Sequence, residues 1–248
     1  MRSRHAAVAV ALALLLSVPA PGQRSAGPLA GAAAAVRAVP GDTTTLCVLR
    51  IDQATGSTVD VYFSGMPGNQ PATSQNFVAL WQNSVIPWTV APLQKTTVLQ
   101  NAESGTLVLL GVSITTVAYT VGYAVGPRVA DVCASAGLQP DGTRGPTDAV
   151  SMSITALGSN SISIHYHTLA GYLPATSGNW IGLWRGRASP YNPPPPVARI
   201  QIPGDVTDDD VRIDGVVLRV GSPYTLIYFM GPEMTSAAVI IGFMTPGR

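Results

Sequence analysis

Two histidines separated by a single residue are the side chains in this sequence best suited to metal chemistry. His165 and His167 lie in a segment in which Ile162, Ile164 and Tyr166 alternate with polar residues. Alternation of this kind is typical of a half-buried strand, so both imidazoles are expected on its outward face. Two imidazoles at this spacing can share a metal ion such as zinc, which requires one or two further ligands. The alternative interpretation is two exposed surface side chains.

Aspartates form the second candidate group, because five of the eleven in the predicted mature chain fall within residues 205–214. Calcium favours carboxylate and carbonyl oxygens, which makes Asp205, Asp208 and Asp210 candidate ligands for Ca²⁺ or, with the two histidines, for a catalytic metal. The spacing is not that of an EF-hand, since Arg212 occupies a ligand position and no glutamate closes the loop. A solvated turn before a strand at 211–219 is the alternative.

The two cysteines, Cys47 and Cys133, are the only ones in the chain. They fall in the first and last strands expected for one domain. In an exported protein such a pair is best explained as a disulfide that closes the domain. Closing a loop of this length stabilises a fold by roughly 4–5 kcal/mol. A reactive thiol is disfavoured, because no histidine is near either cysteine in the sequence.

Two proline-flanked loops each carry an aromatic residue. The run Tyr191-Asn-Pro-Pro-Pro-Pro196 must be extended, and the earlier segment 86–92 places Trp88 between prolines in the same way. With Arg185 and Arg187 close by, Trp88 and Tyr191 are candidate contacts for an extracellular glycan or protein. A stiff loop that only blocks a sheet edge is the alternative.

A repeated structural unit is expected to position these residues. The chain contains nearly the same eleven-residue segment twice. Residues 71–81 read PATSQNFVALW and residues 174–184 read PATSGNWIGLW, with seven identities at an offset of 103. A second pair of similar segments, 118–127 and 223–232, is offset by 105. Two extra residues therefore enter the second copy, most simply in the loop after Trp184.

The pattern of each copy predicts short strands that are rich in Val, Ile, Thr and Tyr and are separated by turn residues. In the second copy we expect strands near 149–156, 160–168, 178–185, 197–202, 211–219, 223–230 and 236–244. Seven strands at this spacing predict an all-β protein of two tandem immunoglobulin-like β-sandwich domains after a signal peptide. The expected parts are a signal peptide and disordered lead at 1–38, domains at 42–136 and 148–248, and a linker at 137–147.

The tryptophan-bearing strand is apolar on both faces. Trp180, Gly182 and Trp184 share one face, whereas Ile181 and Leu183 share the other. Such a strand fits the middle of a sheet, with one face in the sandwich core and the other covered by a loop or by the neighbouring domain. An exposed aromatic platform for sugar stacking is the alternative.

The same strand resembles one in SKICH-type β-sandwich domains, which carry Asp-Trp-Ile/Val-Gly-Leu/Ile-aromatic, then a Tyr-x-x-x-Tyr strand and a closing strand with Ala or Ser. Here Asn179-Trp-Ile-Gly-Leu-Trp184, Tyr224-Thr-Leu-Ile-Tyr228 and Ser236-Ala-Ala238 stand in similar order. The likeness covers roughly residues 150–244 and, more weakly, 45–134. It implies a fold and no role, because Asn179 replaces the acid of the family and those domains are intracellular.

The N-terminus and the charge balance indicate export. Arg2 and Arg4 precede an uncharged apolar stretch at 6–16 that is too short to span a bilayer, which is the layout of a secretory signal peptide. From Val39 onward ten basic residues oppose thirteen acidic ones, a net charge of about −3. No basic face for nucleic acid is therefore expected, and no transmembrane segment remains after signal removal.

The sequence contains no motif of a known catalytic site. The predicted mature chain has two histidines and two glutamates, so few side chains of these types are available for acid–base catalysis. The first hypothesis is a secreted, non-enzymatic binding protein made of two repeated modules, with no cofactor. The alternatives are a metal-dependent secreted hydrolase that uses His165 and His167, and a self-assembling surface or matrix protein. The sequence predicts no oligomeric state.

Overall fold

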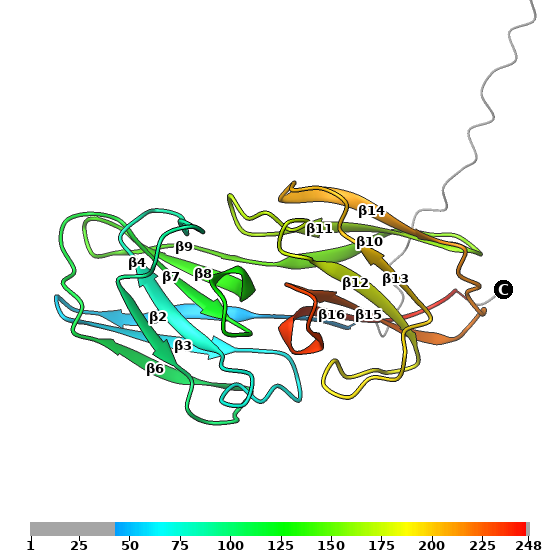
Figure 1. The fold of residues 1–248 in the computed structure, drawn as a ribbon, viewed down its shortest axis with the longest axis horizontal. Helices are drawn as coiled ribbons and strands as arrows, with labels where there is room; N and C mark the ends of the chain where they lie inside the picture. Colours follow the sequence, from blue (N-terminus) through cyan, green and yellow to red (C-terminus); the bar gives the residue numbers. More distant parts are fainter. Residues whose placement is uncertain (1–42, 247–248) are drawn as a thin grey trace, which may run out of the picture. The chain divides into compact units, whose positions relative to one another are not determined.

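Alternating apolar residues place the core of each repeat between two antiparallel sheets in the computed structural model, which describes residues 43–246 (Figure 1). Immunoglobulin-like β-sandwiches are therefore confirmed as the fold class. The predicted signal peptide and lead at 1–38 lie outside the described residues. Within the described part of the chain, no helix has the length and apolarity needed to cross a bilayer.

The first sandwich pairs a three-stranded sheet with a five-stranded one. The three-stranded sheet has the order β2 (Val48–Ala54), β3 (Thr58–Ser64), β6 (Ser104–Leu110). The five-stranded sheet has the order β5 (Gln94–Thr97), β4 (Phe77–Trp81), β7 (Tyr119–Ala124), β8 (Val132–Leu138), β9 (Arg144–Ala149). A single turn of 3-10 helix, η1 (Val129–Asp131), precedes β8.

The second sandwich repeats this plan. Its three-stranded sheet has the order β10 (Ser151–Leu157), β11 (Ser161–His167), β14 (Asp208–Asp214). Its five-stranded sheet has the order β1 (Thr43–Leu46), β16 (Ala237–Met244), β15 (Pro223–Phe229), β12 (Trp180–Arg185), β13 (Ala198–Gln201). The turn η2 (Met234–Ser236) precedes β16. All seven strands expected for this copy are present, although the one expected at 211–219 is β14, which spans Asp208–Asp214.

The two repeats exchange their first strands. β1 pairs with β16 of the second repeat, whereas β2, which follows after Cys47, pairs with β3 of the first. Likewise β9 pairs with β8 of the first repeat, and β10, which follows after Val150, pairs with β11 of the second. Each five-stranded sheet is thus completed by the leading strand of the other copy.

This exchange corrects the expected linker at 137–147. Leu138 ends β8, and Arg144 begins β9 after a turn in which the Gln139 amide donates to the Thr143 carbonyl oxygen at 2.8 Å. The segment looked like a linker because its strand contains Gly145 and Pro146, which are both rare in strands.

The register also places the two extra residues of the second copy. Phe77 pairs with Thr97 in β5, and its equivalent Trp180 pairs with Gln201, so one residue enters between β12 and β13. The other enters between β14 and β15, because the offset between the repeats is 105 only from β7 and β15 onward. The expectation that both lie in the loop after Trp184 holds for one of them.

The predicted disulfide is confirmed. Cys47 and Cys133 are bonded, with their Cα atoms 6.0 Å apart and a sequence separation of 86. Cys47 lies between β1 and β2, so the bond fixes the point at which the chain passes from one sandwich to the other.

The tryptophan face of β12 is the outer face of its sheet. Ile181 is paired with Tyr228, whose ring meets that of Tyr166 across the sandwich at 5.9 Å, so the Ile181 face is the inner one. On the outer face Trp184 is 1% exposed, and its Nε1–H donates to the Pro194 carbonyl oxygen at 2.7 Å. The proline-rich loop therefore covers this face, as one of the sequence alternatives expected.

Gly182 is required between the two tryptophans. A methyl group at this position would overlap both indole rings. The first repeat builds the same outer layer, in which Trp81 Nε1–H donates to the Val90 carbonyl oxygen at 3.0 Å. Each sheet thus carries two apolar layers, one inside the sandwich and one beneath its own loop.

Candidate functional site

The aromatic residue of each proline-flanked loop contacts the other repeat. Trp88 Nε1–H donates to the Ala170 carbonyl oxygen at 2.9 Å, and its ring packs on Tyr172 with centroids 4.7 Å apart. Gly171 lies beneath this ring with φ +72. Trp88 is thus half-buried in a contact with the second repeat, and its role as a ligand contact stays a prediction.

Tyr191 is the equivalent of Trp88 in the second repeat, and it packs in the reciprocal way. The Tyr191 Cδ2 atom lies 3.2 Å from the position that a Cβ atom on Gly68 would occupy. Gly68 has φ +85. Burial raises the pKa of the Tyr191 phenol. The Tyr191 hydroxyl has no hydrogen-bond partner among the described residues. Tyr191 therefore also contacts the other repeat, and its role as a ligand contact stays a prediction.

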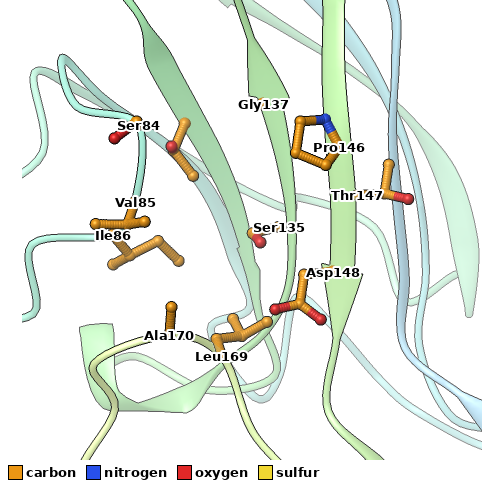
Figure 2. A pocket seen from close by; sticks show the side chains of 11 residues that line it. Ser84, Val85, Ile86, Ser135, Gly137, Pro146, Thr147, Asp148, Leu169 and Ala170 are labelled. Carbon is orange, nitrogen blue, oxygen red and sulfur yellow. The ribbon is translucent and has the colours of Figure 1, made fainter.

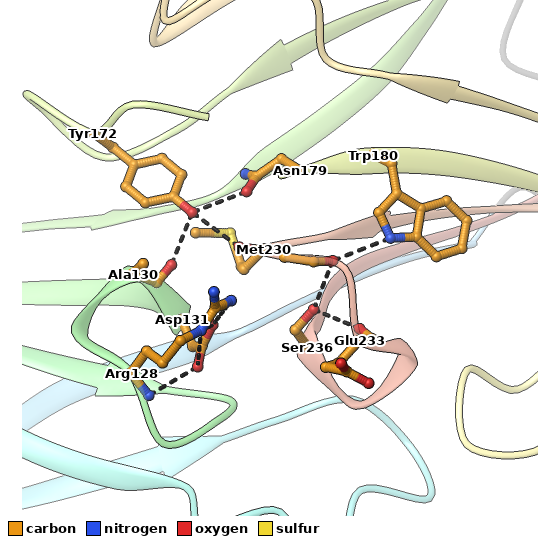
Figure 3. A network of polar contacts seen from close by, with 10 residues as sticks. Arg128, Ala130, Asp131, Tyr172, Asn179, Trp180, Met230, Glu233 and Ser236 are labelled. Carbon is orange, nitrogen blue, oxygen red and sulfur yellow. Dashed lines mark hydrogen bonds and ion pairs between the residues drawn. The ribbon is translucent and has the colours of Figure 1, made fainter. Parts of the chain in front are cut away.

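A polar network surrounds the hydroxyl of Tyr172 (Figure 3). The Tyr172 hydroxyl is within 2.8 Å of the Ala130 carbonyl oxygen, 2.9 Å of Asn179 Oδ1 and 3.0 Å of the Met230 carbonyl oxygen. Because it has one proton, it donates to one of these acceptors at a time. Asn179 Nδ2 in turn donates to the Tyr228 hydroxyl at 2.9 Å. The network joins η1 of the first repeat to β12 and β15 of the second.

The buried tyrosines predict a loss of stability at high pH. Burial raises the pKa of Tyr123 and of Tyr172 to about 12. The folded state therefore holds these protons more tightly than the unfolded chain, and the resulting stabilisation, about 2–3 kcal/mol for each residue, is complete below pH 10 and is lost as the pH rises toward 12.

Absorbance of phenolate measures this directly. We expect Tyr123 and Tyr172 to ionise near pH 12, and the Tyr172→Phe variant to lose one equivalent from that late step. Ionisation of all eight tyrosines in a single step around pH 10 would contradict the prediction.

Two equivalent grooves lie on the outer faces of the five-stranded sheets. The first groove, of about 290 Å³, lies among Ile86 of the loop after β4, Ser135 of β8, Asp148 of β9 and Leu169 of the second repeat (Figure 2). The second groove, of about 580 Å³, is built from the equivalent segments of the other copy, including β1, β15, β16 and the loop 187–189.

The grooves differ in charge. Arg187 is the charged residue that lines the second groove, and its equivalent in the first groove is Ser84. The first groove instead carries Asp148, whose equivalent in the second is Thr45. The second groove also presents the hydroxyl groups of Thr43, Thr45, Ser189 and Thr225 beside apolar residues such as Ile240 and Met244. The duplicated grooves have therefore diverged into an anionic one and a larger cationic one.

Arg185 and Arg187, both predicted as ligand contacts, have different places. Both are exposed, and neither forms an ion pair among residues 43–246. Arg187 lines the second groove, whereas Arg185 ends β12 outside the groove lining. Sequence reasoning missed Thr43, Thr45, Ser189 and Thr225. The repeat offset of 103 aligns Thr43-x-Thr45 with Pro146-x-Asp148, and this alignment is the sequence signal that could have identified the two threonines.

The structure brings together four of the five predicted metal ligands. His165 pairs with Asp210 in the strand register, and its ring nitrogens lie 3.3 Å from Asp208 Oδ1 and 3.3 Å from Asp210 Oδ1. His167 Nδ1 lies 3.1 Å from Asp208 Oδ2, and His167 Nε2 lies 3.1 Å from Asp148 Oδ1. These aspartates belong to strands and not to a loop, which corrects the turn expected at 205–210.

The geometry does not support a metal centre at this cluster. Each imidazole nitrogen faces its own carboxylate oxygen, and nowhere in residues 43–246 do three His, Cys, Asp or Glu side chains converge as a metal ion requires. Asp205 lies elsewhere and accepts hydrogen bonds from the Thr176 amide at 2.8 Å and the Thr176 hydroxyl at 2.7 Å. These bonds lower the pKa of Asp205 and fix a turn.

Comparisons with known proteins leave the family open. No protein-family model matches the sequence, and no curated protein matches it. The FN1-FN3 domains of chicken CNTN1 share 15% identity at a TM-score of 0.27, covering 77% of this chain and 61% of that one. The BSP domain of a biofilm associated protein shares 13% sequence identity at a TM-score of 0.26, in a match that covers 82% of this chain and 30% of that one. The two tandem V-type regions of VCBP3, a v-region-containing chitin binding protein, share 11% sequence identity with this chain at a TM-score of 0.27. That match covers 82% of this chain and 100% of the VCBP3 chain. Likenesses at this level carry no functional argument.

Proposed function

We propose that this protein is a secreted, non-enzymatic interaction module that binds an anionic extracellular ligand in the second groove. The observation that carries the proposal is the Arg187 guanidinium, which is exposed beside a hydroxyl-lined groove and has no ion pair among the described residues. A guanidinium presents a planar set of donors that matches a carboxylate.

The lining supports binding in preference to catalysis. The second groove is lined by no histidine, cysteine, aspartate or glutamate, so it has no general acid–base pair. Its hydroxyls supply donors and acceptors, and Ile240 and the exposed Met244 supply apolar contact. The first groove is smaller and carries Asp148, which opposes an anion. The ligand is therefore assigned to the second groove alone.

A binding screen tests this assignment. The full chain is applied to glycan and protein arrays, and the hits are measured again with Arg187→Glu. We expect affinity for the acidic hits to fall at least tenfold, because the change replaces an attraction by a repulsion. Arg199→Glu is the matched control, since Arg199 is an exposed residue of β13 that lines neither groove. Equal binding by wild type and Arg187→Glu would contradict the proposal.

A further inference from the structure

The geometry points to a more specific ligand, an extended acidic segment of an extracellular protein that adds to the free edge of β1 as a new strand. The inference rests on the proposed function and names the partner of the same groove. Addition of a peptide strand to a sheet edge is a general mode of recognition, in which main-chain hydrogen bonds supply affinity and neighbouring pockets supply specificity.

β1 offers the required hydrogen-bonding groups. It is the terminal strand of its sheet, paired on one side with β16. The Cys47 amide donates to the Ala238 carbonyl oxygen at 3.2 Å, so Thr45 and Thr43, at alternate positions, also face β16. Thr44 and Leu46 therefore direct their N–H and C=O groups to the open side, where no other described strand is paired.

This edge lacks the features by which proteins usually block strand addition. Edge strands are commonly protected by charged residues, prolines or bulges. The equivalent strand β9 has Pro146 and Asp148, and its pairing with β8 shifts register between Ala136 and Leu138. β1 reads Thr-Thr-Thr-Leu and pairs with β16 without any shift. Within residues 43–246, β1 is therefore the exchanged strand whose outer edge lacks these blocking features.

The second groove begins at the same strand. Thr43 and Thr45 of β1 line it, together with Arg187. Successive side chains of a strand point to opposite faces, so every second side chain of an added peptide would lie on the groove side. An aspartate or glutamate at one of these positions would meet the Arg187 guanidinium, which forms no ion pair with any described residue. The edge thus supplies the backbone contacts, and the groove selects an acidic sequence.

A second copy of this chain is a weaker occupant. Pairing β1 with β1 of another molecule would join four residues from each chain, whereas stable interfaces bury roughly 1,200–2,000 Å² in total. A separate peptide can pair with the edge of β1 and place side chains in the second groove, and it needs no extended interface between two folded domains. An extended segment of another protein is therefore the favoured occupant.

Selection from a phage-displayed library of random peptides on the immobilised full chain tests the inference. We expect enriched peptides that alternate β-branched residues with an acidic residue. Thr44→Pro removes an outward N–H without touching the ladder to β16, and it should weaken binding of these peptides at least tenfold. Thr147→Pro, at the equivalent position of β9, is the matched control and should bind as the wild type does.

Amide exchange of the wild-type complex gives a second readout that needs no variant. Bound peptide should slow exchange at Thr44 and Leu46 and leave Thr45 and Cys47 unchanged. Loss of binding in Arg187→Glu, with no effect of Thr44→Pro and no added protection, would overturn strand addition and retain the groove. Binding that neither change affects would overturn both proposals. Failure to enrich any peptide, or a dimer that Thr44→Pro dissociates, would overturn the peptide assignment.

Discussion

Replacing Trp184 by alanine is expected to lower the free energy of unfolding by about 3–5 kcal/mol. The indole is 1% exposed, meets the rings of Trp180 and Phe229 in tilted and edge-on contacts, and donates to the Pro194 carbonyl oxygen. Its removal leaves a cavity beneath the proline-rich loop, which cannot collapse freely because its prolines fix the backbone. Urea unfolding followed by fluorescence and circular dichroism measures the change.

Trp81→Ala in the first repeat is the companion experiment. Trp81 has the same position, the same burial of 1% exposure and the same kind of hydrogen bond to its loop. The two variants should therefore lose similar stability. A loss below about 1 kcal/mol in both would mean that the outer layers are not part of the packed structure.

Removing the disulfide is expected to have an effect of similar size. The double variant Cys47→Ser/Cys133→Ser should lose about 4–5 kcal/mol, because the bond closes a long loop and so restricts the unfolded chain. The cysteines are 86 residues apart and both buried, Cys47 between β1 and β2 and Cys133 in β8. Denaturant unfolding with and without a reductant gives the measurement.

The same comparison includes an internal control. Reductant should shift the unfolding midpoint of the wild type toward that of the double variant and should leave the variant unchanged. A wild type that unfolds at the same denaturant concentration with and without reductant would contradict the assigned contribution of the bond.

The sequence was sufficient for features that depend on local periodicity and on the repeat. Alternation in Ile162, Ile164 and Tyr166 predicts a strand because only one face is buried, and β11 is found there. The repeated tryptophan motif predicts a doubly apolar strand, which is β12. The cysteines could be paired because the repeat map places both in one copy.

Features that depend on pairing between distant segments could not be predicted. β1 looks like the opening of the first sandwich, but the register with β16 assigns it to the second. The run Asp208–Asp210 has low strand propensity, and it is held in β14 by its pairing with His165 and His167. The packing of Trp88 and Tyr191 on the other copy could not be predicted either, because a sequence does not show which distant segments its loops will meet.

Amide hydrogen exchange along residues 43–47 tests the central claim most directly, namely that the first strand of one repeat completes the sheet of the other and leaves one edge open. The account predicts alternation, with slow exchange at Thr45 and Cys47, whose amides bond to β16, and fast exchange at Thr44 and Leu46. Uniformly fast exchange would show that β1 does not pair with β16, and uniformly slow exchange would show that its edge is already covered.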